Sequence, residues 1–173
     1  MTCKAIFTIL VSALLLPAPK LGAQSLSERF AMEPAGNKFG ARETTLDFFV
    51  SHSVAEHQDF TGGRLGTGFG INHFFLTYIG AGLDTGIDKW DWPNHINGSV
   101  IFRYPIEKWS VAPYVFTGFG RQFHDTSQWT YHIAGGFDYR LNPKTGVFTD
   151  IGATIPDVSR DFMLWRLGLR FRF

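Results

Sequence analysis

Cysteine, long apolar segments and an excess of charge of either sign are what this chain lacks. Its only cysteine is Cys3, so a disulfide framework is excluded and a cysteine-based metal site is not expected. The 16 Lys and Arg residues nearly balance the 15 Asp and Glu residues, which gives no electrostatic reason to expect nucleic acid as a partner. Beyond Ala23 no apolar run reaches the roughly 20 residues of a membrane helix. A membrane span in that part of the chain therefore has to be a closed barrel.

The N-terminus carries the pattern of a secretory signal peptide. Lys4 precedes an apolar run over residues 5–16, and prolines and small residues follow before Ala23. The run is too short to cross a bilayer, and a buried N-terminal helix is the alternative. We expect residues 1–23 to be a signal peptide cleaved after Ala23. Gln24 follows instead of the cysteine that a lipid anchor requires.

Residues 24–43 lie ahead of the main domain, which we expect at 44–173. Ser25 and Glu28 have the spacing of a capping box, which favours one or two helical turns before Pro34. A frayed segment is the alternative. We therefore expect a periplasmic N-terminal leader at 24–43, with or without a short helix.

The rest of the chain alternates apolar and polar residues with a period of two, as strands with one apolar face do. The alternating segments are each about ten residues long, which suits a tilted membrane crossing. The eight expected strands cover approximately residues 44–54, 63–72, 75–84, 95–104, 111–120, 129–141, 146–155 and 161–173. An even number of antiparallel strands closes a barrel with both ends on one side. We predict an all-β fold, an eight-stranded antiparallel up-and-down transmembrane β-barrel.

Short and long connections alternate between the expected strands. The short ones lie near residues 72–74, 105–109 and 142–144, and the longer ones near 54–62, 85–94, 121–128 and 156–160. Bacterial barrels have short periplasmic turns and longer outer loops. This order predicts the outer membrane of a Gram-negative-type bacterium, with both termini in the periplasm.

Alternation alone does not say which face of the strands points outward, and a soluble lipocalin-like barrel with an apolar lumen is the alternative. Glycines recur on the polar face, for example at Gly68, which suits a narrow lumen. Tyrosines and tryptophans such as Tyr104 and Trp129 lie near strand ends on the apolar face, like the aromatic girdles of membrane barrels. Both features favour lipid on the apolar side.

The terminal strand carries the most specific pattern. Its apolar face runs without interruption to Phe173, while three arginines lie on the other face. In this ending the chain resembles the small eight-stranded outer-membrane barrels of the OmpA/OmpX type. The resemblance implies that the barrel-assembly machinery reads the ending during biogenesis, and that outer-membrane lipid and lipopolysaccharide surround the protein. The implied assembly signal consists of Leu167, Leu169, Phe171 and Phe173.

Charged residues recur on the polar face of the strands. The interior of an eight-stranded barrel is just wide enough for side chains to fill it, and a buried charge without a partner costs several kcal/mol. We predict a structural network of ion pairs that plugs the lumen, with Asp47 paired to Arg170 and Arg64 to Asp84. A gated conduction path through the same charges is the alternative. The predicted network contains Asp47, Arg64, Asp84, Arg103, Asp138, Arg140, Asp150, Arg166 and Arg170.

Polar residues of the expected outer loops raise an enzyme hypothesis. Barrel enzymes that modify lipid A, the palmitoyltransferases and deacylases, use outer-loop or outer-wall histidine, serine and acidic residues. The chain offers His57 or His124, Asp88 or Asp91, and Ser127. The local patterns that mark those enzymes are missing, however, and solvated loops collect polar residues in any case. A catalytic triad is recognised by its geometry.

We therefore expect a monomeric, non-enzymatic outer-membrane barrel with a side-chain-filled lumen and a role in envelope integrity or surface interaction. No catalytic, cofactor-binding or metal-binding residues are predicted. The short outer loops weaken the case for an adhesin, because recognition is built on loops. Two alternatives stay open: a narrow porin-like channel for small solutes, and a lipid A-modifying acyltransferase or deacylase.

Overall fold

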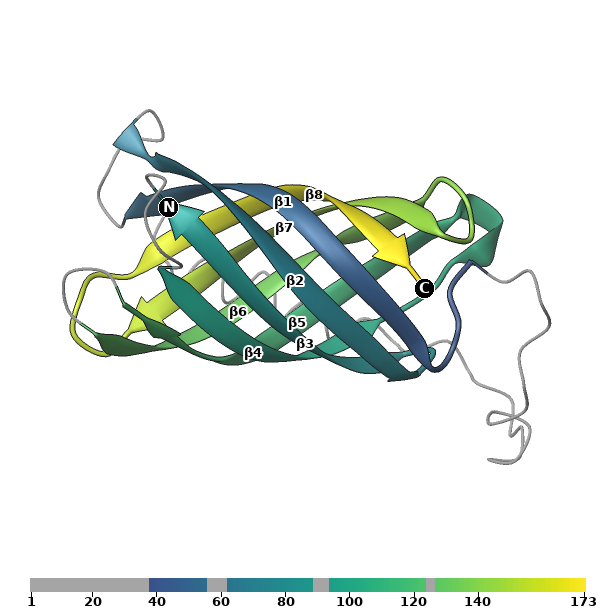
Figure 1. Cartoon of the computed structure of the whole chain (residues 1–173), viewed down its shortest axis with the longest axis horizontal. Coiled ribbons are helices and arrows are strands. Elements are labelled where there is room, and N and C mark those ends of the chain that lie inside the picture. The colour runs from purple at the N-terminus through teal and green to yellow at the C-terminus, as the bar shows by residue number, and fades with distance from the viewer. Residues whose placement is uncertain (1–37, 56–61, 89–93, 124–126) are drawn as a thin grey trace, which may run out of the picture.

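The computed structural model describes residues 38–55, 62–88, 94–123 and 127–173, which form a closed barrel of eight strands (Figure 1). The predicted signal peptide and most of the predicted leader lie outside these ranges. Among the described residues, no helix is long and apolar enough to cross a membrane. The strands are β1 (Glu43–Ala55), β2 (Arg64–Leu76), β3 (Ile79–Asp88), β4 (His95–Arg103), β5 (Val111–Gln122), β6 (Gln128–Arg140), β7 (Thr145–Pro156) and β8 (Phe162–Arg172), and a short 3-10 helix, η2 (Glu107–Trp109), lies between β4 and β5.

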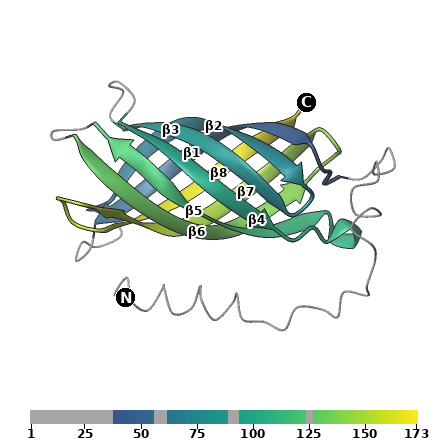
Figure 2. The same cartoon turned by 90° about the horizontal axis from the view of Figure 1, so that it is seen from below.

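Every strand is antiparallel to its neighbours in the sequence, and β8 pairs with β1 to close the barrel. The closing register runs from Thr45 opposite Arg172 to Ala55 opposite Phe162. The strands are tilted relative to the long axis of the barrel (Figure 2). The predicted fold class is therefore confirmed.

The two ends of the barrel differ in their connections. At one end, here called the turn end, lie the connections β2–β3, β4–β5 and β6–β7, the start of β1 and the end of β8. At the other, the loop end, lie the connections β1–β2, β3–β4, β5–β6 and β7–β8. The two ends of the strand array are thus on one side, as an even strand count requires.

The apolar face of the strands points outward, as predicted. Large side chains such as Leu65, Phe119 and Phe137 are 76%, 70% and 57% exposed, respectively. Side chains of the opposite parity point into the lumen, where Phe49 and Phe148 are buried. A continuous apolar exterior of this kind is what a lipid-facing surface requires.

Glycine on the inner face makes room for lumen side chains. A Cβ atom built on Gly68 would collide with the ring of Phe49 on the adjacent strand. At this position of β2 the ring of Phe49 therefore occupies the space that a side chain would take, which supports a filled lumen.

The predicted turn at residues 72–74 is wrong. The strand β2 continues to Leu76, and the chain turns at Thr77 and Tyr78. Asn72 and Phe74 lie inside the barrel, where Asn72 bonds to Asp47 and Phe74 is fully buried. An Asn-His-Phe sequence is compatible with a turn locally, but lumen contacts that the local sequence does not reveal hold it in the strand.

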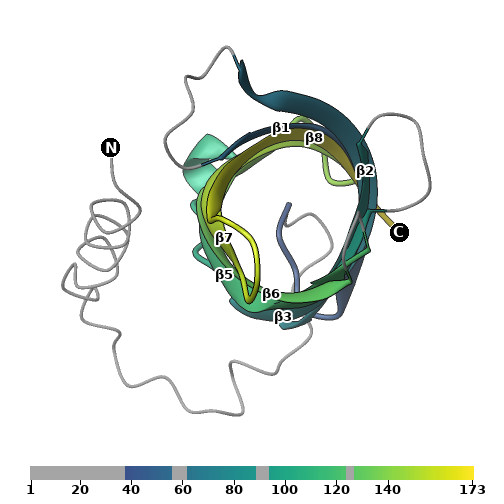
Figure 3. The same ribbon diagram turned by 90° about the vertical axis from the view of Figure 1, so that its left-hand side faces the viewer.

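The barrel also begins earlier than predicted. Glu43, assigned above to the leader, is the first residue of β1. The segment before it, residues 38–42, runs inside the ring of strands at the turn end (Figure 3), and Phe39 is fully buried. This part of the expected leader is thus a component of the barrel core.

Candidate functional site

Glu43 is the centre of a buried ion-pair cluster at the turn end. Its Oε2 accepts a hydrogen bond of 3.0 Å from Arg103 Nη2, and its Oε1 accepts one from Arg140 Nη2. All three side chains are at most 1% exposed. One carboxylate thus joins β1, β4 and β6 across the lumen, because these strands are not neighbours in the barrel.

The cluster continues towards β8 through Asp138. Arg140 Nε donates to Asp138 Oδ1 at 3.1 Å, and Arg170 Nη1 donates to Asp138 Oδ2 at 2.8 Å. Arg170 also donates from Nε and Nη2 to the two oxygens of Asp47, at 2.8 and 2.7 Å. This fork-to-fork geometry is the strong form of an arginine–carboxylate bond. We refer to Glu43, Asp47, Arg103, Asp138, Arg140 and Arg170 as the turn-end cluster.

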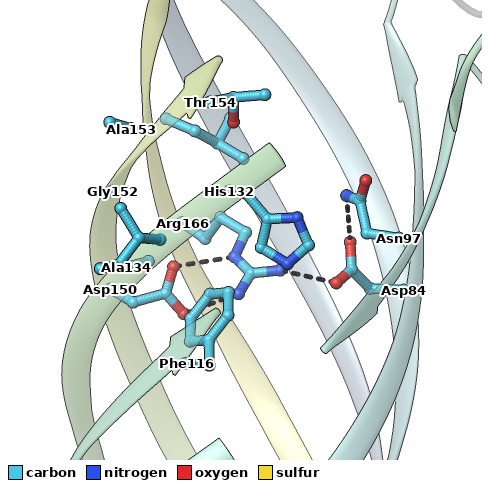
Figure 4. A pocket seen from close by; sticks show the side chains of 12 residues that line it. Asp84, Asn97, Phe116, His132, Ala134, Asp150, Gly152, Ala153, Thr154 and Arg166 are labelled. Atoms are coloured by element: carbon cyan, nitrogen blue, oxygen red, sulfur yellow. Dashed lines mark hydrogen bonds and ion pairs between the residues drawn. The ribbon is translucent and has the colours of Figure 1, made fainter. Parts of the chain in front are cut away.

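A second cluster occupies the middle of the lumen (Figure 4). Arg166 donates from Nε and Nη2 to the two oxygens of Asp150, at 2.8 and 3.1 Å, and its Nη1 lies 3.5 Å from Asp84 Oδ2. Asn97 donates to Asp84 at 3.1 Å, and the hydroxyl of Tyr114 donates to Asp150 at 2.7 Å. We call Asp84, Asp150 and Arg166 the mid-lumen cluster.

Aromatic rings fill the space around the guanidinium groups. The guanidinium carbon of Arg166 lies 5.0 Å from the ring centroid of Phe49 and 4.9 Å from that of Phe116. The guanidinium carbon of Arg103 lies 3.6 Å from the ring centroid of Phe74. Desolvated cation–π contacts of this kind are attractive, and the rings leave little space for solvent beside the ion pairs.

A segment from the N-terminal side closes the turn end of the barrel. The ring of Phe39 lies between Arg103 and Arg140, with centroid distances of 5.5 and 5.2 Å to the two guanidinium carbons. Gly40 donates its N–H to Glu43 at 3.0 Å and accepts a hydrogen bond of 2.8 Å from Arg103. Residues 38–42, which we call the plug segment, therefore seal the turn-end cluster.

Contacts with the β4–β5 connection hold the plug segment from outside. The carboxylate of Glu107 accepts hydrogen bonds from the backbone N–H groups of Lys38 and Phe39, at 3.3 and 3.2 Å. Lys38 Nζ donates to the hydroxyl of Ser110 at 2.6 Å. The segment is thus attached both to the rim and to the lumen charges.

The structure brings together most of the predicted network residues, but one predicted pair is wrong. Asp47 and Arg170 form the expected ion pair. Arg64 does not meet Asp84: it is exposed at the loop end of β2, opposite Ser53, whereas Asp84 lies opposite Gly70, six positions further along β2. At about 3.3 Å per residue this offset exceeds the reach of an arginine.

Glu43 is the functional residue that the sequence analysis missed. It has the same parity as Thr45 and Asp47, which also point into the lumen. Extending the alternation one step towards the N-terminus would have included it. The expected strand began at residue 44, so Glu43 was assigned to the leader instead.

The residues of the enzyme hypothesis are not assembled into a site by the described part of the chain. His57, Asp91 and His124 lie outside the described residues. Ser127 Oγ accepts a hydrogen bond of 2.8 Å from Arg121 Nε, and Asp88 is the last residue of β3. Among the described residues, no group of three or more His, Cys, Asp or Glu side chains could hold a metal ion.

The residues of the implied assembly signal lie on the outward face at the end of β8. Leu167, Leu169 and Phe171 are 40%, 46% and 37% exposed, and Phe173 follows the strand. Their accessibility on one face is compatible with recognition during assembly, which stays a prediction.

Comparisons with known proteins support the fold. No protein-family model matches the chain, and no curated protein sequence does either. Among solved structures, the N-terminal β-barrel domain of Pseudomonas aeruginosa OprF is similar with a TM-score of 0.63 and 17% identity, covering 78% of this chain and 99% of that one. Neisserial surface protein A has a TM-score of 0.56 and 10% identity, covering 76% and 96%.

The outer membrane protein OprG from Pseudomonas aeruginosa is also similar, with a TM-score of 0.53 and 12% identity, covering 78% of this chain and 97% of that one. The chain therefore has the fold of the small eight-stranded outer-membrane barrels, and the predicted resemblance is confirmed for the fold. Identities this low carry no further statement about function.

Proposed function

We propose that the chain is a non-conducting outer-membrane barrel whose lumen is a structural core and whose role lies in envelope integrity or in interactions at its surface. The observation that carries this proposal is the ion-paired lumen. The turn-end and mid-lumen clusters join strands across the lumen, and their charged groups are already paired with each other.

The energetics of the clusters favour a plug over a pore. Removing one partner of a buried ion pair costs roughly 3–5 kcal/mol, because the other charge stays buried without compensation. A permeating ion would have to separate several such pairs in succession. The plug segment adds a second barrier, since Phe39 fills the space between Arg103 and Arg140.

The proposal includes the orientation and surroundings of the barrel. The two shortest connections, β2–β3 and β6–β7, lie at the end where β1 begins and β8 ends, whereas the third connection at that end, β4–β5, is longer and contains η2. The two short turns support periplasmic termini by the rule for bacterial barrels. We also propose a monomer in contact with outer-membrane lipid and lipopolysaccharide, inserted by the barrel-assembly machinery. The apolar exterior supports contact with lipid.

Conductance in a planar lipid bilayer tests the proposal. Refolded protein, shown to be folded by its heat-modifiable mobility, should give no current steps. The lumen variant Asp47→Asn and the control variant Asp157→Asn, at an exposed position of the loop end, should be measured beside it. Steady steps in the wild-type protein that change with Asp47→Asn but not with Asp157→Asn would contradict the proposal and favour the channel. Silence in a folded sample is the expected result.

A further inference from the structure

Two cavities lie between the mid-lumen cluster and the loop end, and the three residues of that cluster line the lower one. The upper cavity has a volume of about 40 Å³ and the lower one about 20 Å³. They share Asn97, Thr154 and Leu164 as lining residues. A cavity needs about 10–15 Å³ on this measure to hold one water. The upper cavity therefore holds about three water-sized groups and the lower one about one or two.

The upper cavity is lined mainly by neutral polar side chains. Ser51, Ser53, Gln122 and Thr130 contribute hydroxyl or amide groups, and Phe162 supplies an apolar wall. A concave surface with several hydrogen-bonding groups and an apolar wall is typical of a small-molecule site.

Two buried polar side chains at these cavities have no hydrogen-bond partner in the described part of the chain. They are Thr130, through its Oγ1, and His132, through both ring nitrogens. Thr130 is 4% and His132 is 6% exposed. Thr130 lines the upper cavity and His132 the lower one, where Figure 4 places its ring near Arg166 and Asp84. Buried polar groups are rarely left without partners, so both point to an occupant that donates and accepts hydrogen bonds.

The charges that line the lower cavity favour a neutral occupant. Arg166 is bonded to Asp150 and lies close to Asp84, and Asp84 also accepts a bond from Asn97. An entering anion would compete with two carboxylates for one guanidinium group, and an entering cation would compete with that guanidinium group. Neutral hydroxyl groups can bond to Thr130 and His132 without separating the ion pair.

We propose that these cavities form a binding site for a small neutral polyhydroxylated solute, a polyol or the edge of a sugar, that enters from the loop end. This inference goes beyond the proposed function, because it assigns a ligand class to the lumen. Entry from the turn end is blocked by the turn-end cluster and the plug segment. A neutral imidazole presents one donor and one acceptor nitrogen, which matches a hydroxyl group that both accepts and donates.

The test is a titration of the refolded full chain in lipid nanodiscs with glycerol as the probe. The readout is the ¹H–¹⁵N spectrum of the His132 ring and of the Thr130 and Thr154 amides. Dimethoxyethane, which has a similar size but no hydroxyl donor, is the matched probe. We expect saturable shifts with glycerol and none with dimethoxyethane.

Two lumen variants and one outward-facing control distinguish binding at the site from a general effect of glycerol on the solvent. Thr130→Val and His132→Phe should each weaken glycerol binding about fivefold, the loss expected for one neutral hydrogen bond. Thr67→Val, the same change on the exposed outer face of β2, should leave binding unchanged. The proposal is overturned if the shifts do not saturate, if dimethoxyethane produces the same shifts, or if both lumen variants bind glycerol like the wild-type protein.

Discussion

The two halves of the lumen differ in how their interior is filled. The half at the turn end is filled by paired charges and rings, with Glu43, Asp138 and Arg140 fully or almost fully buried. The half at the loop end contains an upper cavity lined mainly by neutral polar side chains and a lower cavity that the charged mid-lumen cluster also lines. The difference teaches that a small barrel can fill one half of its lumen with ion pairs and rings while the other half keeps room for an occupant. We call the filled half at the turn end the base.

A substitution of Glu43, at the centre of the base, should give the largest loss of stability. In Glu43→Gln, both Arg103 and Arg140 lose their shared carboxylate in a fully buried site. We expect the free energy of unfolding to fall by roughly 3–5 kcal/mol, measured by urea titration of the protein folded in lipid vesicles. The control is Asp157→Asn at an exposed position of the loop end, which should cost less than about 1 kcal/mol. Equal losses would mean that Glu43 does not organise the base.

Removing the plug ring should give the next largest effect. Phe39→Ala leaves a void between Arg103 and Arg140, and truncation of a buried Phe costs about 3 kcal/mol or more. Urea titration should show this loss, and hydrogen exchange at the amides of the turn end should become faster. Phe119→Ala on the exposed outer face is the comparison, and its exchange rates at the turn end should match the wild-type protein.

A substitution in the mid-lumen cluster should lower the free energy of unfolding less than a substitution in the base, because the mid-lumen cluster borders the cavities. Asp84→Asn removes one of the two carboxylates near Arg166 and keeps the bidentate hydrogen bond between Arg166 and Asp150. We expect the free energy of unfolding to fall by about 1.5–3 kcal/mol, the range for a hydrogen bond to a charged group. Asp150→Asn, which disrupts this bidentate hydrogen bond, should be clearly more destabilising in the same urea titration. The reverse order would contradict the assigned partners.

The smallest change in the free energy of unfolding is expected in the half of the lumen at the loop end. Thr130→Val replaces a buried hydroxyl group that has no hydrogen-bond partner among the described residues. Replacing such a group with a methyl group of similar shape should leave the free energy of unfolding unchanged within about 0.5 kcal/mol, or raise it. A loss above about 1 kcal/mol would show that the hydroxyl group already has a partner in the solute-free protein.

Sequence reasoning predicted the number of strands, their inner and outer faces and the pair Asp47–Arg170, because each follows from alternation and from closure of the last strand on the first. It failed for Arg64 and Asp84, which lie on adjacent strands, because a turn at residues 72–74 sets a different register between β2 and β3 from the observed turn at Thr77 and Tyr78. The sequence at residues 72–74 is compatible with a turn, but Phe74 inside the lumen holds it in the strand. The contact that decides this register is one that the local sequence does not encode.

The sequence by itself determined that this chain makes an apolar-walled barrel with charges inside, because side-chain direction in a strand changes at every residue whatever the partner strand is. Only the tertiary structure decided which charges meet. Glu43 contacts Arg103 and Arg140 across the lumen from strands that are not its neighbours. Such contacts depend on strand register and barrel closure together, so they exist only once all eight strands are in place.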